Sequence, residues 1–289
     1  MVTKVKTGIV FEGGAFRTIF SCGVMDALVE NDIMPDYMIG VSAGAAYGVS
    51  MASKQTRRNL DVLMKYRNDK RYLGLSNMID KDNKSIYGLE FSYETIPNEL
   101  NLFDYDAFKQ YKGDFYCVVT NLLTGQPEYM KYTGDDRTNT VLKATCALPM
   151  LFPPIIINDV PYMDGGLSDS IPYLKAIEDG CDRIIVVLTR QSGYTKTTSR
   201  STKAIAYSYR NQYPKLTETM LTRASRYNES LKGLDQYVKE GRIITIQPTT
   251  SKGFSRLEKD KNKILSMYND GYNQCYELLD TIKEFYGIK

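Results

Sequence analysis

The sequence feature that most constrains the fold is the pentapeptide Gly40-Val41-Ser42-Ala43-Gly44, which has the pattern G-x-S-x-G. The apolar residues 37–39 before it predict a short strand, and the small residues of 43–54 after it predict a helix. At a sharp turn from strand to helix, a serine is held in a strained backbone with its hydroxyl exposed, and flanking glycines permit the close approach. The pattern alone fits two interpretations, a catalytic nucleophile or a glycine-rich turn that only packs a helix on a sheet.

Composition limits the class of protein. A chain of 289 residues with 43% hydrophobic and 25% charged residues is typical of a folded protein, as one large domain or a core with an extension. The net charge of +3 gives no sign of nucleic-acid binding. We see no secretory signal at the N-terminus and no apolar stretch near the roughly 18–20 residues that span a membrane. We therefore expect a cytoplasmic protein.

The chain contains no histidine. This absence excludes Ser/His/Asp and Cys/His catalysis and disfavours a transition-metal site, so we expect neither a metal nor a cofactor. If Ser42 is a nucleophile, a group other than imidazole must accept its proton. The five cysteines stand singly in apolar segments and are predicted to be buried small hydrophobic residues, not disulfides or metal ligands: Cys22, Cys117, Cys146, Cys181 and Cys275.

A glycine-rich turn lies near the N-terminus. An apolar run over residues 7–11 predicts a buried strand, the turn reads Glu12-Gly13-Gly14-Ala15-Phe16-Arg17, and a helical pattern continues to about residue 31. Backbone amides in such a strand–turn–helix unit point outward and carry partial positive charge. An oxyanion hole and a plain tight turn are both compatible with this stretch, whereas the dinucleotide pattern G-x-G-x-x-G is absent.

Residues 54–71 carry seven basic and two acidic side chains over an apolar stripe, which predicts a basic amphipathic helix. Two interpretations stay open: a solvated helix face, or peripheral contact with an anionic membrane. Residues 72–113 have no clean period and are rich in Tyr, Asn and Asp, as in an insertion or a lid over a site.

A second candidate site residue follows a strand. Residues 160–163 predict a strand that ends at Asp164-Gly165-Gly166, which presents a carboxylate at a cleft or only makes an Asp-Gly turn. The other predicted elements of this region are strands over 114–123, 128–132, 155–157 and 183–188, and helices over 141–148 and 172–178.

The character of the sequence changes near residue 190. Residues 191–203 predict a Ser/Thr-rich mobile loop, residues 204–240 are mostly helical, 242–247 predict a further strand, and 256–286 predict a last helix with Gly271 as a kink. We therefore expect a catalytic core over 1–195 and a mainly helical extension over 196–289 that packs on it.

Three motifs in this order, Gly13-Gly14-Ala15-Phe16-Arg17, Gly40-Val41-Ser42-Ala43-Gly44 and Asp164-Gly165-Gly166, resemble those of the patatin-like phospholipases. The resemblance covers roughly residues 5–190. It implies a three-layer α/β/α fold with a mostly parallel central sheet, and a Ser/Asp dyad without histidine. The chain departs from the usual D-G-G-G-x-R-G loop, because Glu12, Ala15 and Thr18 replace the outer Asp, the third Gly and the last Gly. Ala15 fits this loop without strain if its φ is negative.

The resemblance implies roles for the motif residues. Ser42 is expected to attack an acyl ester, Asp164 to act as the base, and the amides of Gly13, Gly14 and Ala15 to bind the oxyanion. Gly40, Gly44, Gly165 and Gly166 are supporting residues, and Arg17 holds the loop, meets a lipid phosphate or is only a solvated charge. The expected substrates are phospholipids or lysophospholipids. Acyl transfer or thioester hydrolysis on the same dyad, and a lipid-surface binding protein with a vestigial site, are the alternatives.

Overall fold

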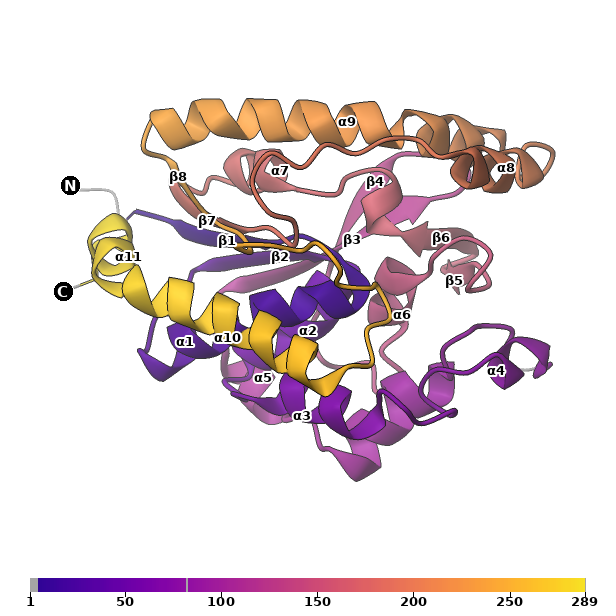
Figure 1. Ribbon diagram of the computed structural model, residues 1–289, viewed down its shortest axis with the longest axis horizontal. Helices are drawn as coiled ribbons and strands as arrows, with labels where there is room; N and C mark the ends of the chain where they lie inside the picture. The colour runs from indigo at the N-terminus through magenta and orange to yellow at the C-terminus, as the bar shows by residue number, and fades with distance from the viewer. Residues whose placement is uncertain (1–4, 82, 289) are drawn as a thin grey trace.

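One mixed sheet organises the computed structural model, which describes residues 5–81 and 83–288 (Figure 1). Within these residues the strand order is β5-β6-β3-β2-β1-β7-β8, and β4 pairs with β3. The pairs β1–β2, β1–β7, β2–β3 and β7–β8 are parallel, and β3–β4, β3–β6 and β5–β6 are antiparallel. The strands are β1 (Thr7–Phe11), β2 (Tyr37–Val41), β3 (Asp114–Asn121), β4 (Pro127–Lys131), β5 (Ile155–Ile157), β6 (Val160–Asp164), β7 (Arg183–Val187) and β8 (Ile243–Ile246).

Helices cover both faces of the sheet (Figure 1). One layer holds α7 (Tyr173–Glu178), α8 (Arg200–Ser208) and α9 (Pro214–Lys239), and the other holds α1 (Ile19–Glu30), α2 (Ala43–Ala52), α3 (Arg58–Tyr66), α5 (Tyr105–Gln110) and α10 (Lys261–Glu277). The remaining elements are η1 (Ala15–Thr18), α4 (Ser76–Ile79), η2 (Phe91–Leu100), α6 (Thr140–Cys146), η3 (Gly165–Leu167) and α11 (Leu279–Tyr286). The predicted three-layer α/β/α fold with a mostly parallel sheet and a helical C-terminal region is confirmed.

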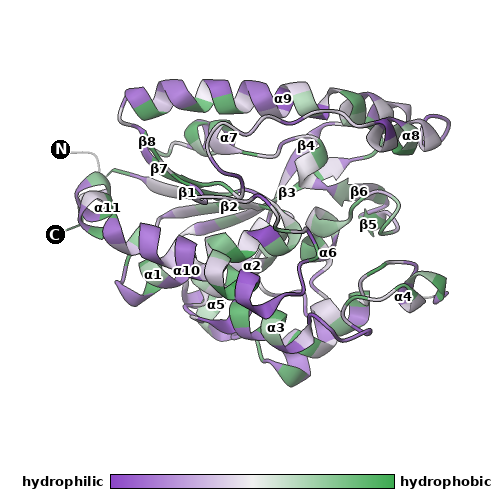
Figure 2. Cartoon of the chain, in the orientation of Figure 1, coloured by the Kyte–Doolittle hydropathy of each residue, from purple (hydrophilic) through white to green (hydrophobic). Residues whose placement is uncertain are grey.

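The central strands are apolar because both of their faces are covered. In β1, Ile9 and Phe11 belong to the core beneath α1, α2 and α10, whereas Val10 belongs to the core on the opposite face. Successive side chains of a strand point to opposite faces, so a strand between two helical layers needs apolar residues at every position. Figure 2 shows hydrophilic residues along the outer helices α9 and α10, which have one side in solvent.

The C-terminal part of the chain contributes to the same sheet. The strand predicted over 242–247 is present as β8, which pairs with β7, and α9 and α10 lie on opposite faces (Figure 1). The predicted helix over 204–240 is two helices, and the first of them begins at Arg200, inside the predicted loop. The boundary at residue 195 stays a prediction.

The predicted kink at Gly271 is wrong. Helix α10 continues through Gly271 to Glu277, and the chain breaks at Leu278 before α11. A Cβ at position 271 would lie 2.0 Å from the carbonyl oxygen of Phe20 in α1. The glycine therefore permits close packing of two helix backbones and does not bend the helix.

The predicted continuous basic helix over 54–71 is also wrong. Helix α3 covers only Arg58–Tyr66, because Lys54 and Arg57 have φ values of 55° and 61°. The Arg58 guanidinium turns inward and donates hydrogen bonds to the carbonyls of Asn101 and Leu102, and Arg71 pairs with Asp69. A uniform basic face is consequently not formed.

All five cysteines are buried and free, as predicted. Among the described residues, no helix is both long enough and apolar enough to cross a membrane.

Candidate active site

Ser42 occupies the turn between β2 and α2, as predicted. Its φ of 55° and ψ of −129° are strained for a residue with a side chain, and it is the N-cap residue of α2. A Cβ at Gly40 would lie 2.5 Å from backbone atoms of Ala45, and one at Gly44 would lie 2.5 Å from the carbonyl oxygen of Phe11. The two glycines of the pentapeptide therefore allow the tight turn that presents the serine.

Thr145 holds this turn, a role that the sequence did not predict. The Ser42 backbone N–H donates to Thr145 Oγ1 at 2.9 Å, and the Thr145 hydroxyl donates to the carbonyl of Val118 in β3 at 2.5 Å. Both partners are distant from Ser42 in the sequence. The one signal was that residues 144–149, Ala-Thr-Cys-Ala-Leu-Pro, resemble the segment that patatin-like phospholipases carry before their aspartate.

Strand register brings Asp164 to the level of Ser42. Val41 in β2 pairs with Val118 in β3, and the next residue of β3, Val119, pairs with Asp164 at the end of β6. The serine and the carboxylate thus flank one central strand, although 122 positions of sequence separate them. The carboxylate is 2% exposed, and its Oδ1 accepts a hydrogen bond from the N–H of Gly166 at 2.8 Å.

The environment of Asp164 raises its pKa. Burial is the main cause, because desolvation disfavours the charged form. The Ser42 hydroxyl, the Arg223 guanidinium and the Gly166 amide oppose this rise by stabilising the carboxylate. A carboxylate with a raised pKa is a stronger base than one in water. Gly165 lies against β3, where a Cβ would be 2.1 Å from the Val118 carbonyl oxygen.

The turn over Gly13, Gly14 and Ala15 lies directly against the serine. A Cβ at Gly13 would lie 2.7 Å from the Val41 carbonyl oxygen and 2.8 Å from the Ser42 Cβ. Within the described residues, the amides of these three positions have no hydrogen-bond acceptor. Ala15 has a φ of 50°, so the negative φ on which an unstrained alanine depends is not found, and the residue stores strain.

Glu12 anchors this turn from below. The side chain is 3% exposed, and its carboxylate accepts hydrogen bonds from the Thr189 N–H at 2.6 Å, the Thr189 hydroxyl at 3.0 Å and the Tyr227 hydroxyl at 2.9 Å. The departure from the usual loop sequence thereby acquires a structural role, because the glutamate links the turn to the segment just after β7 and to α9. Arg17 is also buried, with 6% exposure, and is not a solvated charge.

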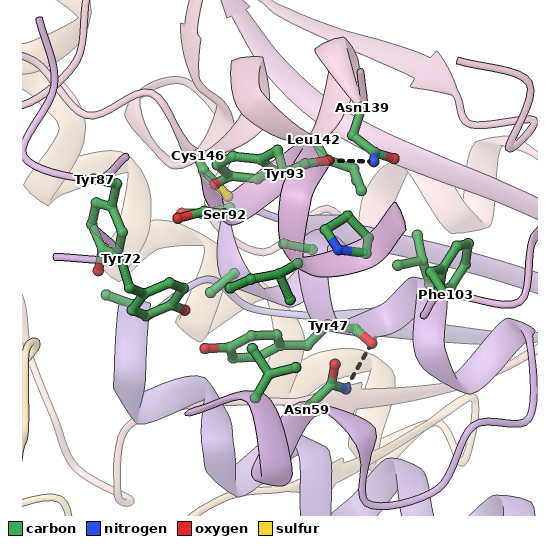
Figure 3. A pocket seen from close by; sticks show the side chains of 18 of the residues that line it. Tyr47, Asn59, Tyr72, Tyr87, Ser92, Tyr93, Phe103, Asn139, Leu142 and Cys146 are labelled. Carbon is green, nitrogen blue, oxygen red and sulfur yellow. Dashed lines mark hydrogen bonds between the residues drawn. The ribbon is translucent and has the colours of Figure 1, made fainter. Parts of the chain in front are cut away.

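Two cavities meet at Ser42. The first, of about 120 Å³, is lined mainly by apolar and aromatic side chains, and Figure 3 shows Tyr47, Tyr72, Tyr87 and Tyr93 around it. Asn59 and Asn139 brace its walls by donating to the backbone carbonyls of Tyr47 and Tyr93. Many of its walls come from residues 72–103, so the segment predicted to be an insertion or lid encloses this cavity.

The second cavity, of about 270 Å³, is polar and also borders Asp164. Its residues come from the glycine-rich turn and from the C-terminal part of the chain, including Arg190, Lys196, Arg223 and Arg256. No motif in the sequence singled out these four cations. In the part of the chain that the structure describes, no group of three or more Cys, Asp or Glu residues is arranged to hold a metal ion.

The glycine-rich turn, Ser42 and Asp164 all lie within a stretch that matches a known protein family. The model of the family described as "Patatin-like phospholipase" matches residues 9–177, which is more than half of the chain. The chain belongs to the patatin-like phospholipase family. A second model, a domain of unknown function named DUF6363, matches residues 213–287 of this patatin-like protein.

The relatives share only part of their length with this patatin-like protein. The uncharacterized protein YjjU of Escherichia coli is 26% identical over 64% of this chain and 52% of its own length. Lysophospholipase nte1 of Aspergillus terreus is 29% identical over 63% of this chain and 12% of its own. The crystal structure of VipD from Legionella pneumophila aligns with 96% of this chain and 67% of its own, at 15% identity and a TM-score of 0.44.

Proposed function

We propose that this patatin-like protein is a serine hydrolase that releases fatty acid from phospholipids or lysophospholipids. The observation that carries the proposal is the strained Ser42 beside a buried carboxylate in a chain without histidine. The apolar cavity that starts at Ser42 supports an acyl chain as the group held during the reaction. The lysophospholipase name of several fungal relatives points to the same class of substrate.

The proposed chemistry has two half-reactions on one carboxylate. The Ser42 Oγ attacks the ester carbonyl carbon while Asp164 accepts the hydroxyl proton, and the departing alcohol takes that proton as the ester bond breaks. Water then attacks the acyl-enzyme, gives its proton to Asp164, and the proton returns to Ser42 as the fatty acid leaves. The unpaired amides of Gly13, Gly14 and Ala15 are the proposed oxyanion donors, each worth about 2.7–4 kcal/mol in comparable sites.

The test is hydrolysis of nitrophenyl butyrate by the full chain and by two variants, Ser42→Ala and Asp164→Asn. We expect both to lose activity by at least about 1,000-fold, as for other units of nucleophile and base. Matched controls are Ser21→Ala, which removes a buried hydroxyl without a hydrogen-bond partner, and Asp169→Asn, which alters a half-buried carboxylate that accepts a hydrogen bond from Tyr129. Full activity in either dyad variant would contradict the proposal.

Two further measurements separate the alternatives. Adding glycerol as an acceptor distinguishes hydrolysis from acyl transfer, because a transferase makes glycerol ester at the expense of free acid. A fluorophosphonate probe that fails to label Ser42, while lipid vesicles still bind, would identify a lipid-surface protein with a vestigial site.

We further propose that the protein contacts anionic membranes through the segment that carries α4. The segment lies between Leu73 and Tyr87, which form an isolated antiparallel bridge at its base. Tyr87 and the neighbouring Tyr72 line the apolar cavity, so the base of the segment adjoins that cavity. Its tip exposes Leu75 (76%) and Ile79 (85%) beside exposed lysines at 70, 81 and 84, and Figure 1 shows α4 at the edge of the molecule. An apolar tip with flanking lysines suits an anionic bilayer surface.

Vesicle flotation tests this contact. Ile79→Asp is expected to lower binding to vesicles that contain phosphatidylserine, whereas Leu174→Asp, an equally drastic change at an exposed position of α7, is expected to leave it unchanged. Equal binding of both variants would contradict the proposed surface.

A further inference from the structure

The polar cavity beside the dyad is strongly cationic. Five basic side chains line it, from Arg17, Arg190, Lys196, Arg223 and Arg256, against the carboxylates of Glu12 and Asp164. The apolar cavity has one basic side chain, Arg58. The two cavities share Ala15, Ser42 and Leu148, so a ligand that spans both passes the serine hydroxyl.

These cations lack a close ion pair within the described part of the protein. Among the described residues, none of the five forms an ion pair within 4.0 Å. Arg190 lies over the ring of Tyr194 at 4.4 Å, Lys196 lies over the ring of Tyr227 at 3.9 Å, and Arg223 donates to the Gly166 carbonyl. The Glu12 carboxylate is occupied by its hydrogen bonds to Thr189 and Tyr227.

Arg17 provides a second and independent indication of a ligand. The side chain is 94% buried, since its exposure is 6%, and it lines the cationic cavity. In the described part of the chain its Nε atom has no hydrogen-bond partner. A buried guanidinium with an unused donor is costly unless an acceptor arrives.

The cations also raise one another's free energy. Burial, followed by the charges of Arg223, Arg256 and Arg17, lowers the pKa of Lys196 to about 7. Burial and the charges of Arg190 and Arg256 lower the pKa of Arg17 to about 10. A bound anion would reverse both effects, because an opposite charge favours the protonated forms.

We propose that this cleft binds the phosphate of an anionic, phosphomonoester headgroup while the acyl chain occupies the apolar cavity. The proposal rests on the proposed hydrolase function and narrows its substrate class. A guanidinium group can donate two parallel hydrogen bonds to two oxygens of one phosphate. Several guanidinium groups together suit a doubly charged phosphate. A zwitterionic headgroup is disfavoured, because its ammonium group would need a carboxylate partner in the cleft. The Glu12 carboxylate is already hydrogen-bonded, and the Asp164 carboxylate faces the serine.

The proposal also assigns a role to the domain of unknown function. Arg223 and Arg256 lie within residues 213–287, and Arg190 and Lys196 follow the end of the patatin match at residue 177. Helix α9 and the loop before α10 thereby complete a cleft whose nucleophile comes from the patatin part. The C-terminal region selects the headgroup, and the patatin part cleaves the ester.

Binding is tested without catalysis, on the full chain with Ser42→Ala. Calorimetric titration compares decyl phosphate, decylphosphocholine and inorganic phosphate. The two detergents are used below their critical micelle concentrations. We expect decyl phosphate to bind at least tenfold more tightly than decylphosphocholine and inorganic phosphate. Equal affinity for the two detergents would overturn the headgroup assignment, and inorganic phosphate binding as tightly as decyl phosphate would identify a site for free phosphate instead.

Variants locate the site. Arg223→Gln and Arg256→Gln are each expected to weaken decyl phosphate binding about tenfold, the usual effect of removing one charged hydrogen-bond donor. Arg256 is exposed, so its variant keeps the test valid if Arg223→Gln does not fold. The matched control is Arg183→Gln, at the start of β7 and far along the strand from the cleft, for which we expect unchanged affinity. An unchanged affinity in Arg256→Gln would contradict the proposal.

Kinetics separates this proposal from the proposed hydrolase function. For the active chain, Arg256→Gln should lower kcat/KM for a 1-acylglycerol 3-phosphate about tenfold more than for the matching 1-acylglycerol. An equal loss on both esters refutes the phosphate site and leaves the hydrolase intact. Hydrolysis of neither ester, with tight decyl phosphate binding, refutes the hydrolase and retains the phosphate site.

Discussion

Substituting Gly13 by alanine tests whether the glycine-rich turn is an oxyanion hole. The added Cβ would lie 2.7 Å from the Val41 carbonyl oxygen and 2.8 Å from the Ser42 Cβ. Carbon atoms in good contact are about 3.5–4.0 Å apart, so the turn and the serine must separate by more than about half an ångström. Both neighbours are fixed by β2 and by the Thr145 hydrogen bond, and we expect the turn to move.

The magnitude follows from the two effects of that movement. Overpacking of a tight contact costs about 1–3 kcal/mol of folding free energy. Displacing one oxyanion donor costs about 2.7–4 kcal/mol of transition-state stabilisation, or about 100- to 1,000-fold in kcat. We therefore predict a fall of at least about 100-fold in kcat with nitrophenyl butyrate, together with a Tm that is lower by only a few degrees.

The assay compares kcat, KM and Tm of Gly13→Ala with those of Gly48→Ala. Gly48 is a buried glycine of α2, where an added Cβ would lie 3.1 Å from the Phe115 ring and away from the serine turn. We expect the control to keep its kcat. A Gly13→Ala protein that is folded and retains kcat within about threefold of the parent would refute the oxyanion role of this turn.

Three further perturbations follow from the same site. Ser42→Gly is expected to raise Tm by about 2 °C relative to Ser42→Ala, because only glycine relieves a φ of 55°, a strain worth about 1 kcal/mol; equal Tm values in calorimetry would contradict the strain. Asp164→Asn is expected to stabilise the fold at pH 8. The folded pKa of Asp164 lies above its unfolded value, so the wild-type fold loses stability as the pH rises through that folded pKa, and the amide escapes this loss. The advantage in Tm should vanish near pH 4, and a larger advantage in acid would show the opposite sign. Thr145→Val removes the acceptor of the Ser42 N–H and should cost about 1–3 kcal/mol in urea unfolding and lower kcat, whereas an unchanged kcat would show that the turn holds itself.

The sequence by itself determined the local elements and excluded catalysis by histidine. Local patterns predicted the strands at residues 7–11 and 183–188, and the turn that holds Ser42, within a residue or two. Apolar periodicity and turn chemistry are local properties of the sequence. The lack of histidine is a property of composition, so the exclusion of the usual catalytic partners needs no knowledge of the fold. The order of the three motifs was sufficient to predict the family, and the match over residues 9–177 confirms it.

Only the tertiary structure decided how distant residues meet. Ser42 and Asp164 lie at the same height in the sheet because β6 pairs antiparallel to β3. The cationic cleft forms because α9 and the loop before α10 reach the same strand ends. Local patterns also misjudged Gly271 and the basic run over 54–71, because a glycine that packs against a neighbouring helix resembles one that bends its own. Side-chain burial, backbone strain and charge compensation are set by neighbours from other parts of the chain, and no local window of sequence contains them.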